Sequence, residues 1–155
     1  MHIVERAGNK KKLTHIRPVD DKDFKTITVK RYFFYWKKIK STCPVFKLTL
    51  IDSNDILGLI ALVDYYEEQR TEIKLLAVSI ENLGKEKQFE GTAGCLIAFA
   101  CKEALLKFEN FPCVSLIPKT ELKQHYINKY HMIDAGWQLY LEDMPLLNVI
   151  KEYLA

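Results

Sequence analysis

A strand-like segment that leads into a run of small residues is the part of this chain best suited to holding phosphate. The segment 71–80 is followed by a polar loop, 81–87, and then by Gln88-Phe89-Glu90-Gly91-Thr92-Ala93-Gly94. These residues open an apolar helix that is predicted over 95–108. The free N–H groups of its first turn and the positive end of its dipole would face an anion. Gly91 and Gly94 would let phosphate approach the backbone.

The glycines do not match the common nucleotide motifs. No Lys-Ser or Lys-Thr pair follows them, so this is not a P-loop of the Walker type, and the spacing is not Gly-x-Gly-x-x-Gly. A glycine-rich helix start that merely packs closely on a sheet is the structural alternative.

The pattern that does match is Gln/Arg-x-x-Gly-x-Gly/Ala, met by Gln88, Gly91 and Ala93 after a strand that contains Leu-Leu-Ala-Val. It resembles the acetyl-CoA pyrophosphate loop of the GNAT superfamily of N-acetyltransferases. The resemblance implies acetyl-CoA as cosubstrate and no metal. It implies that the pyrophosphate binds at Gln88, Phe89, Glu90, Gly91, Thr92, Ala93 and Gly94, and that the backbone of Leu76, Ala77 and Val78 binds the pantetheine amides.

Glu72 is the candidate general base. An amine must lose a proton before it can attack a thioester, because ammonium has no lone pair. Alternation along the strand places Glu72 on the same face as Leu76 and Val78. The stretch 71–79 is also similar to the one that carries the glutamate base in histone-type members of the superfamily. The alternative is an exposed glutamate that pairs with Lys74 or with a neighbouring strand.

Tyr126 is the candidate acid for the departing thiolate. Family members often place a tyrosine four residues before a Gly-Phe pair that follows this helix. Here His131 and Met132 occupy that place, and Tyr126 lies five residues before them, whereas Ile127 takes the strict position. Packing in the core is the alternative role for Tyr126. The family's glycine at this place implies left-handed backbone at His131.

An aromatic and basic block lies at 30–40, within a helical region predicted at 24–40 that begins near the acidic run 20–23. Aromatic residues between basic ones can stack bases and bind phosphates, but they also fit the inner face of a helix, and core or pocket wall is the favoured interpretation. In the resemblance this region forms one wall of the acceptor groove, which Tyr32, Phe33, Tyr35 and Trp36 would line.

The remaining patterns predict a mixed α/β (α+β) fold. Strands are predicted at 13–19, 45–52, 56–65, 71–80, 113–117 and 137–142, and helices at 95–108, 121–130 and 143–153. The segments 45–52 and 56–65 form a hairpin around 53–55. The strands before and after the central helix should form a parallel pair. This order is GNAT-like: a mostly antiparallel sheet with a splayed parallel pair, flanked by helices.

Composition indicates one globular domain over residues 1–155. Hydrophobic residues make up 48% and charged residues 28%, and the net charge of +3 is too small to name a partner. The four cysteines have no metal-type spacing, which favours a reduced, cytoplasmic protein. No signal-peptide pattern is found, and no apolar run approaches the roughly 18 residues of a membrane span.

The sequence therefore predicts a cytoplasmic N-acetyltransferase that moves acetyl directly to a primary amine on a small molecule or peptide. A homodimer is left open, and contact with nucleic acid or membrane is not expected. Two alternatives stay open. One is a non-catalytic GNAT-like module that binds acyl-CoA or a protein partner. The other is a small nucleic-acid-binding domain that uses Lys10, Lys11 and Lys12 and the block at 30–40.

Overall fold

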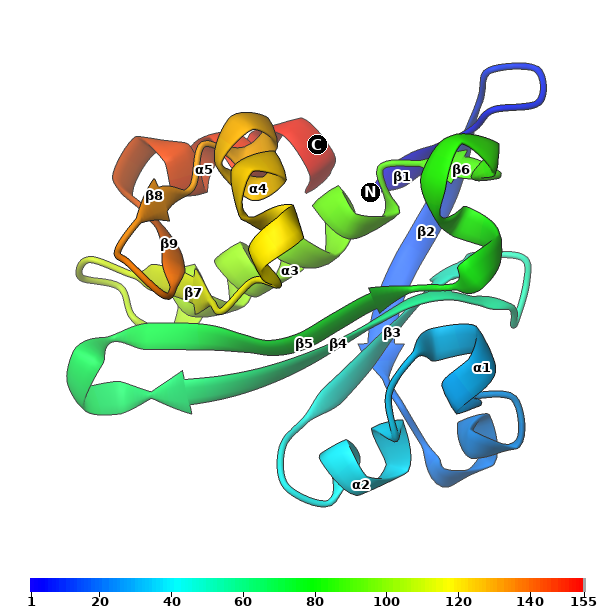
Figure 1. Ribbon diagram of the computed structural model, residues 1–155, viewed down its shortest axis with the longest axis horizontal. Coiled ribbons are helices and arrows are strands. Elements are labelled where there is room, and N and C mark those ends of the chain that lie inside the picture. The colour runs from blue at the N-terminus through cyan, green and yellow to red at the C-terminus, as the bar shows by residue number, and fades with distance from the viewer. Residues whose placement is uncertain (155) are drawn as a thin grey trace. The chain divides into compact units, whose positions relative to one another are not determined.

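The computed structural model describes residues 1–154, which form a mixed α+β fold (Figure 1). The strands are β1 (His2–Glu5), β2 (Lys10–Pro18), β3 (Val45–Leu50), β4 (Ile56–Tyr65), β5 (Arg70–Val78), β6 (Phe89–Glu90), β7 (Cys113–Leu116), β8 (Ile133–Asp134) and β9 (Leu139–Glu142). They form a mostly antiparallel sheet in the order β6-β1-β2-β3-β4-β5-β7-β9-β8. The predicted fold class is confirmed.

The α-helices are α1 (Val29–Tyr32), α2 (Trp36–Lys40), α3 (Thr92–Lys107), α4 (Lys123–Tyr130) and α5 (Asp143–Leu154). Short 3-10 helices occur at Asp21–Lys25, Tyr66–Glu68, Ile80–Asn82, Gly84–Glu86 and Thr120–Leu122. Within residues 1–154, none of the helices has the length and apolar character that crossing a bilayer requires.

The chain divides into two compact units. The first comprises Met1–Ala61 and Leu75–Leu96, and the second comprises Leu62–Lys74 and Ile97–Ala155. The prediction of a single domain over 1–155 stays a prediction.

The first unit contains the predicted hairpin. β3 and β4 pair antiparallel from Val45↔Ala61 onward, with a bulge between Leu48 and Thr49. Gly58 on β4 is required by close packing, because a Cβ there would lie 2.8 Å from Leu96 Cδ1 and 3.2 Å from the Ala77 carbonyl oxygen. The glycine therefore lets the first turns of α3 lie directly against β4.

The helical region predicted at 24–40 is broken into pieces. Asp20 caps the 3-10 helix Asp21–Lys25 as predicted, but α1 begins only at Val29 and ends at Phe33, whose φ is +75°. Four β-branched residues in a row, 26–29, restrict their side-chain rotamers and oppose a continuous helix. The prediction of one helix here was wrong, since α1 and α2 are separate single turns (Figure 1).

The core of the first unit is built around Tyr32 and Trp36, whose side chains are 0% and 1% exposed. The Tyr32 hydroxyl donates to the Ile56 carbonyl oxygen at 2.7 Å, and the Trp36 indole N–H donates to the Tyr32 carbonyl oxygen at 2.9 Å. Both polar atoms are thereby satisfied on burial. The same core cluster contains Val19, which follows β2, and aliphatic residues of β3, β4 and β5: Val45, Ile56, Leu59, Ala61 and Ala77.

The second unit contains the predicted parallel pair. β5 and β7 run parallel, with Arg70↔Cys113 through Ile73↔Leu116 in register. β9 pairs antiparallel with β7, and the two-residue strand β8 pairs with β9. α5 contacts β7 and β9 (Figure 1). The sequence missed β8, because two residues are too few to show alternation.

Candidate active site

The phosphate-binding candidate begins at Gly91, which has a φ of +96°. Only glycine adopts this backbone readily. Its surroundings are open, since the nearest atom to a Cβ built there would be Ile3 Cγ2 at 4.0 Å. The Cys95 N–H donates to the Gly91 carbonyl oxygen at 2.9 Å, which closes the first turn of α3. The N–H groups of Thr92, Ala93 and Gly94 therefore precede the helical hydrogen-bond ladder.

Thr92 adds an unsatisfied polar atom at this helix start. The residue is 3% exposed, and its Oγ1 has no hydrogen-bond partner within residues 1–154. A buried hydroxyl without a partner is uncommon and needs an explanation, of which a ligand is one. Together with the helix dipole, it makes this terminus suitable for an anion.

The residues just before Gly91 are held by the N-terminal strand β1, a pairing that the sequence did not indicate. Phe89 and Glu90 form β6 and pair with Glu5 and Val4 of β1. The backbone N–H of the next residue, Arg6, donates to the Gln88 carbonyl oxygen at 2.9 Å. The segment predicted as an open phosphate loop thus includes a short strand.

The Arg6 side chain continues this attachment. Its guanidinium donates to the carbonyl oxygens of Lys85 and Lys87 and lies 3.7 Å from the Glu90 carboxylate. Lys87 also pairs with Glu90, at 3.5 Å. The two cations offset the carboxylate that lies closest in sequence to Gly91. No local pattern could have identified Arg6, because its partners are about 80 residues away.

Asn82 organises the loop 79–87 from within. It is 5% exposed, its amide donates to Ser79 Oγ at 2.8 Å, and its carbonyl oxygen accepts from the Phe89 N–H at 3.2 Å. The buried amide links the end of β5 to β6. The loop 79–87 is therefore anchored by the buried hydrogen bonds of Asn82 despite its length.

The pantetheine candidates lie in the second half of β5. Ala77 is 6% exposed, and Leu76 and Val78 are half-buried. The parallel register with β7 ends at Ile73, so these three residues lie beyond it on the same strand.

Glu72 lies in the first half of β5 and is 8% exposed. The Tyr65 hydroxyl donates to its Oε2 at 3.3 Å. Tyr65 itself packs under the Arg70 guanidinium, 4.2 Å from the ring centroid. Glu72 is therefore a buried carboxylate held by a single phenol, and none of the ion pairs within residues 1–154 includes it. Of the alternative partners, Lys74 forms no ion pair with Glu72 within residues 1–154, whereas Tyr65 belongs to the neighbouring strand β4.

Tyr126 lies on α4 and is half-buried. Its ring centroid is 5.9 Å from that of His125 and 6.0 Å from that of Tyr130. Burial raises the pKa of Tyr126 above its ordinary value, so the phenol keeps its proton. His131, which ends α4, has the left-handed backbone that the resemblance implied, with φ +59° and ψ +35°.

The four acceptor-wall candidates fall into two groups. Tyr32 and Trp36 are core residues of the first unit, as the burial given above shows, and they have almost no accessible surface. Phe33 and Tyr35 are 38% and 74% exposed. Of the four, only Phe33 and Tyr35 offer a ligand more than a trace of surface.

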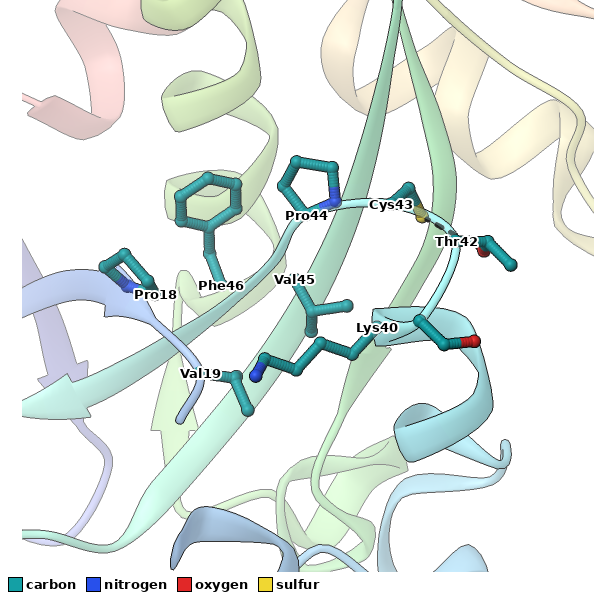
Figure 2. A pocket seen from close by; sticks show the side chains of 9 residues that line it. Pro18, Val19, Lys40, Thr42, Cys43, Pro44, Val45 and Phe46 are labelled. Atoms are coloured by element: carbon teal, nitrogen blue, oxygen red, sulfur yellow. Dashed lines mark hydrogen bonds between the residues drawn. The ribbon is translucent and has the colours of Figure 1, made fainter. Parts of the chain in front are cut away.

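Two hollows flank α2 in the first unit. One, of about 480 Å³, is lined by residues of 18–19 and 40–46. Figure 2 shows Lys40 lying beside Val19 and Val45, and the Cys43 sulfur turned toward Thr42. Lys40 and Cys43 are its only titratable lining residues, so it has no acid–base pair. The other hollow includes Tyr35 in its lining.

The remaining cysteines are inert. Burial raises the pKa of Cys95 to about 11, that of Cys101 to about 12 and that of Cys113 to about 11. A thiol with so high a pKa forms little thiolate, which is the nucleophilic form. Within residues 1–154, no group of His, Cys, Asp and Glu is arranged to hold a metal ion.

Comparisons with known proteins identify the fold. No family model and no curated protein sequence matches the chain. Solved structures do match. Ard1 of Thermoplasma volcanium aligns with a TM-score of 0.62 at 14% identity, over 84% of this chain and 98% of that one. The ribosomal-protein-S18-alanine N-acetyltransferase of Escherichia coli aligns with a TM-score of 0.60 at 10% identity, over 84% and 94%.

A third similar structure contains the expected cosubstrate. It is a Bacillus anthracis protein assigned as a streptothricin acetyltransferase, in complex with acetyl coenzyme A. It aligns with a TM-score of 0.60 at 13% identity, over 84% of this chain and 97% of that one. This chain has the fold of the GNAT N-acetyltransferases.

Proposed function

We propose that the protein is an acetyl-CoA-dependent N-acetyltransferase that moves acetyl directly to a primary amine. One observation carries the proposal. In a GNAT fold, strand β5 holds a buried carboxylate, Glu72, in its first half, and the chain then leads from β5 to a helix start with open backbone at Gly91. A carboxylate that has one phenol as partner can accept a proton.

The helix start suits the pyrophosphate. Free N–H groups at 92–94, the positive end of α3 and the unsatisfied hydroxyl of Thr92 all favour an anion there. The left-handed Gly91 contributes no side chain. The backbone of Leu76, Ala77 and Val78 would bind the pantetheine, since the register with β7 does not extend to them.

The chemistry follows from these assignments. Glu72 takes a proton from the ammonium form of the acceptor, and the freed nitrogen lone pair attacks the thioester carbonyl carbon. The carbon–sulfur bond then breaks, the sulfur leaves as thiolate, and the nitrogen releases its second proton to water, which leaves a neutral amide. Tyr126, whose phenol keeps its proton, donates that proton to the sulfur and recovers it from water.

A covalent acetyl-cysteine intermediate is not part of the proposal. Cys95, Cys101 and Cys113 have raised pKa values and therefore stay mostly in the protonated thiol form. The spacing of the four cysteines favours a reducing compartment such as the cytoplasm.

A panel of amines tests the function. The purified protein is mixed with acetyl-CoA and, in turn, with polyamines, aminoglycosides, peptides with a free N-terminus, and lysine-containing peptides. Release of CoA thiol is followed with a thiol reagent, and the acetylated product is identified by mass spectrometry. At least one class should give thiol release that requires Glu72. Tight binding of CoA with no turnover on any amine would instead indicate a non-catalytic GNAT-like module.

A further inference from the structure

The segment 24–51 carries an unusual concentration of positive charge. It contains seven basic residues and no Asp or Glu, a formal charge of +7 in a chain whose net charge is +3. The seven are Lys25, Lys30, Arg31, Lys37, Lys38, Lys40 and Lys47. The other 127 residues therefore carry a formal charge of −4, since +3 minus +7 is −4.

Three of the seven are neutralised by acids from elsewhere in the first unit. Arg31 pairs with Asp55 at 2.7 Å and with Glu81 at 2.9 Å, and Lys47 pairs with Asp23 at 2.7 Å. Lys40 pairs with Asp21 at 3.4 Å. The remaining four are exposed, and within residues 1–154 none of them forms an ion pair: Lys25, Lys30, Lys37 and Lys38.

Two of these cations, Lys37 and Lys38, line an aromatic hollow of about 550 Å³. Its lining includes Ile27, Phe34, Tyr35, Lys37 and Lys38. Tyr35 is 74% exposed, so most of its ring is open to solvent. A tyrosine whose only role is to pack in the core would be buried, as Tyr32 is. We call Tyr35, Lys37 and Lys38 the aromatic-basic surface.

We propose that the aromatic-basic surface binds single-stranded nucleic acid, with a base stacked on Tyr35 and backbone phosphates at the lysines. Exposed aromatic rings beside lysines are the usual means of binding single strands without sequence preference. A π-face and cations side by side fit a base joined to a phosphate better than an acidic peptide, which has charge but few rings to stack. The proposal does not depend on acetyl transfer.

The test is fluorescence anisotropy with a labelled single strand of about 12 nucleotides, titrated at several salt concentrations. Binding should weaken with salt, with a slope of about −0.7 in log K against log salt for each phosphate contacted. The double variant Lys37→Gln/Lys38→Gln should reduce the magnitude of that slope by about 1.4. Tyr35→Ala should weaken binding roughly tenfold with the slope unchanged, since it removes a stacking contact and no charge. Tyr35→Phe, which keeps the ring, should bind like the wild type.

The matched control is Lys102→Gln/Lys151→Gln, which removes the same charge from exposed positions on α3 and α5. It should leave the salt slope nearly unchanged. Absence of binding at low salt would overturn the proposal, as would equal losses in the two lysine variants, which would indicate nonspecific attraction. Strong competition by polyglutamate, together with unchanged binding of the strand by Tyr35→Ala, would also overturn it. That result would favour an acidic protein partner. Circular dichroism of each variant identifies any that fails to fold, and Tyr35→Phe then decides whether the ring is needed.

Discussion

The two halves of strand β5 differ in the kind of chemistry they can do. In the first half, side chains form the interactions: Arg70 donates to Ser115 Oγ at 2.8 Å, Thr71 donates to Asp64 at 2.8 Å, and Glu72 accepts from Tyr65. The second half, Leu75–Val78, has apolar side chains only, and the turn after it is closed by backbone groups and Asn82. One half can transfer protons, and the other can bind through its main chain.

The difference determines which variants are informative. A side-chain change in the first half should alter the rate and leave ligand affinity nearly intact. A change of backbone conformation after the second half should alter affinity first. Glu72 and Gly91 separate these two effects.

Glu72→Gln should have the largest effect. It keeps the shape of the side chain and its contact with Tyr65 but removes the proton acceptor, so the acetylation rate should fall by roughly 10²–10⁴-fold. CoA affinity, measured by calorimetry, should hardly change. Glu67→Gln is the matched control, because Glu67 is an exposed glutamate in the same β4–β5 connection. A near wild-type rate for Glu72→Gln across pH would mean that Glu72 is structural.

Gly91→Glu should act on affinity. It places a carboxylate where the pyrophosphate is proposed and forces a residue with a Cβ into left-handed backbone. The CoA dissociation constant from calorimetry should rise by about 10–100-fold. Gly84→Glu carries the same charge and a similar strain, since Gly84 has a φ of +69° and nothing within 4 Å of a built Cβ. If both variants bind CoA as tightly as the wild type, the helix start is not the phosphate site.

Interactions within one element or between neighbouring elements could be predicted from the sequence, whereas contacts between distant residues could not. Apolar patterns identified the β3–β4 hairpin and the separate elements β5, α3 and β7. The parallel β5–β7 pair was predicted from the crossover that a strand, a helix and a second strand make. Such patterns could not identify the attachment of β6 to β1 or the role of Arg6, which join residues far apart in sequence. In the segment 24–40 the aromatic residues suited a single helix, but β-branched residues and the left-handed Phe33 break it.

Tyr126→Phe should have a smaller effect than either change. If the Tyr126 hydroxyl protonates the sulfur, turnover should fall by about tenfold, less than for a typical general acid, because a thiolate is a good leaving group. Folding and CoA binding should be unchanged, since the ring contacts of Tyr126 need no hydroxyl. Pre-steady-state measurement of thiol release checks the chemical step. An unchanged rate with altered thermal stability would show that Tyr126 is a packing residue.

His131→Gly should have the smallest effect, on stability alone. Left-handed backbone costs a non-glycine residue roughly 1 kcal/mol. The His131 side chain is exposed, and none of the hydrogen bonds or ion pairs within residues 1–154 includes it to offset this cost. The melting temperature should therefore rise by about 2–4 °C, with the acetylation rate unchanged. Lys129→Gly, an exposed position inside the same helix, should instead lower the melting temperature, because glycine is unfavourable in a helix interior. If His131→Gly is also less stable, α4 does not end in solution at the left-handed residue. The family's glycine position would then no longer support the placement of Tyr126, and only the rate of Tyr126→Phe would decide its role.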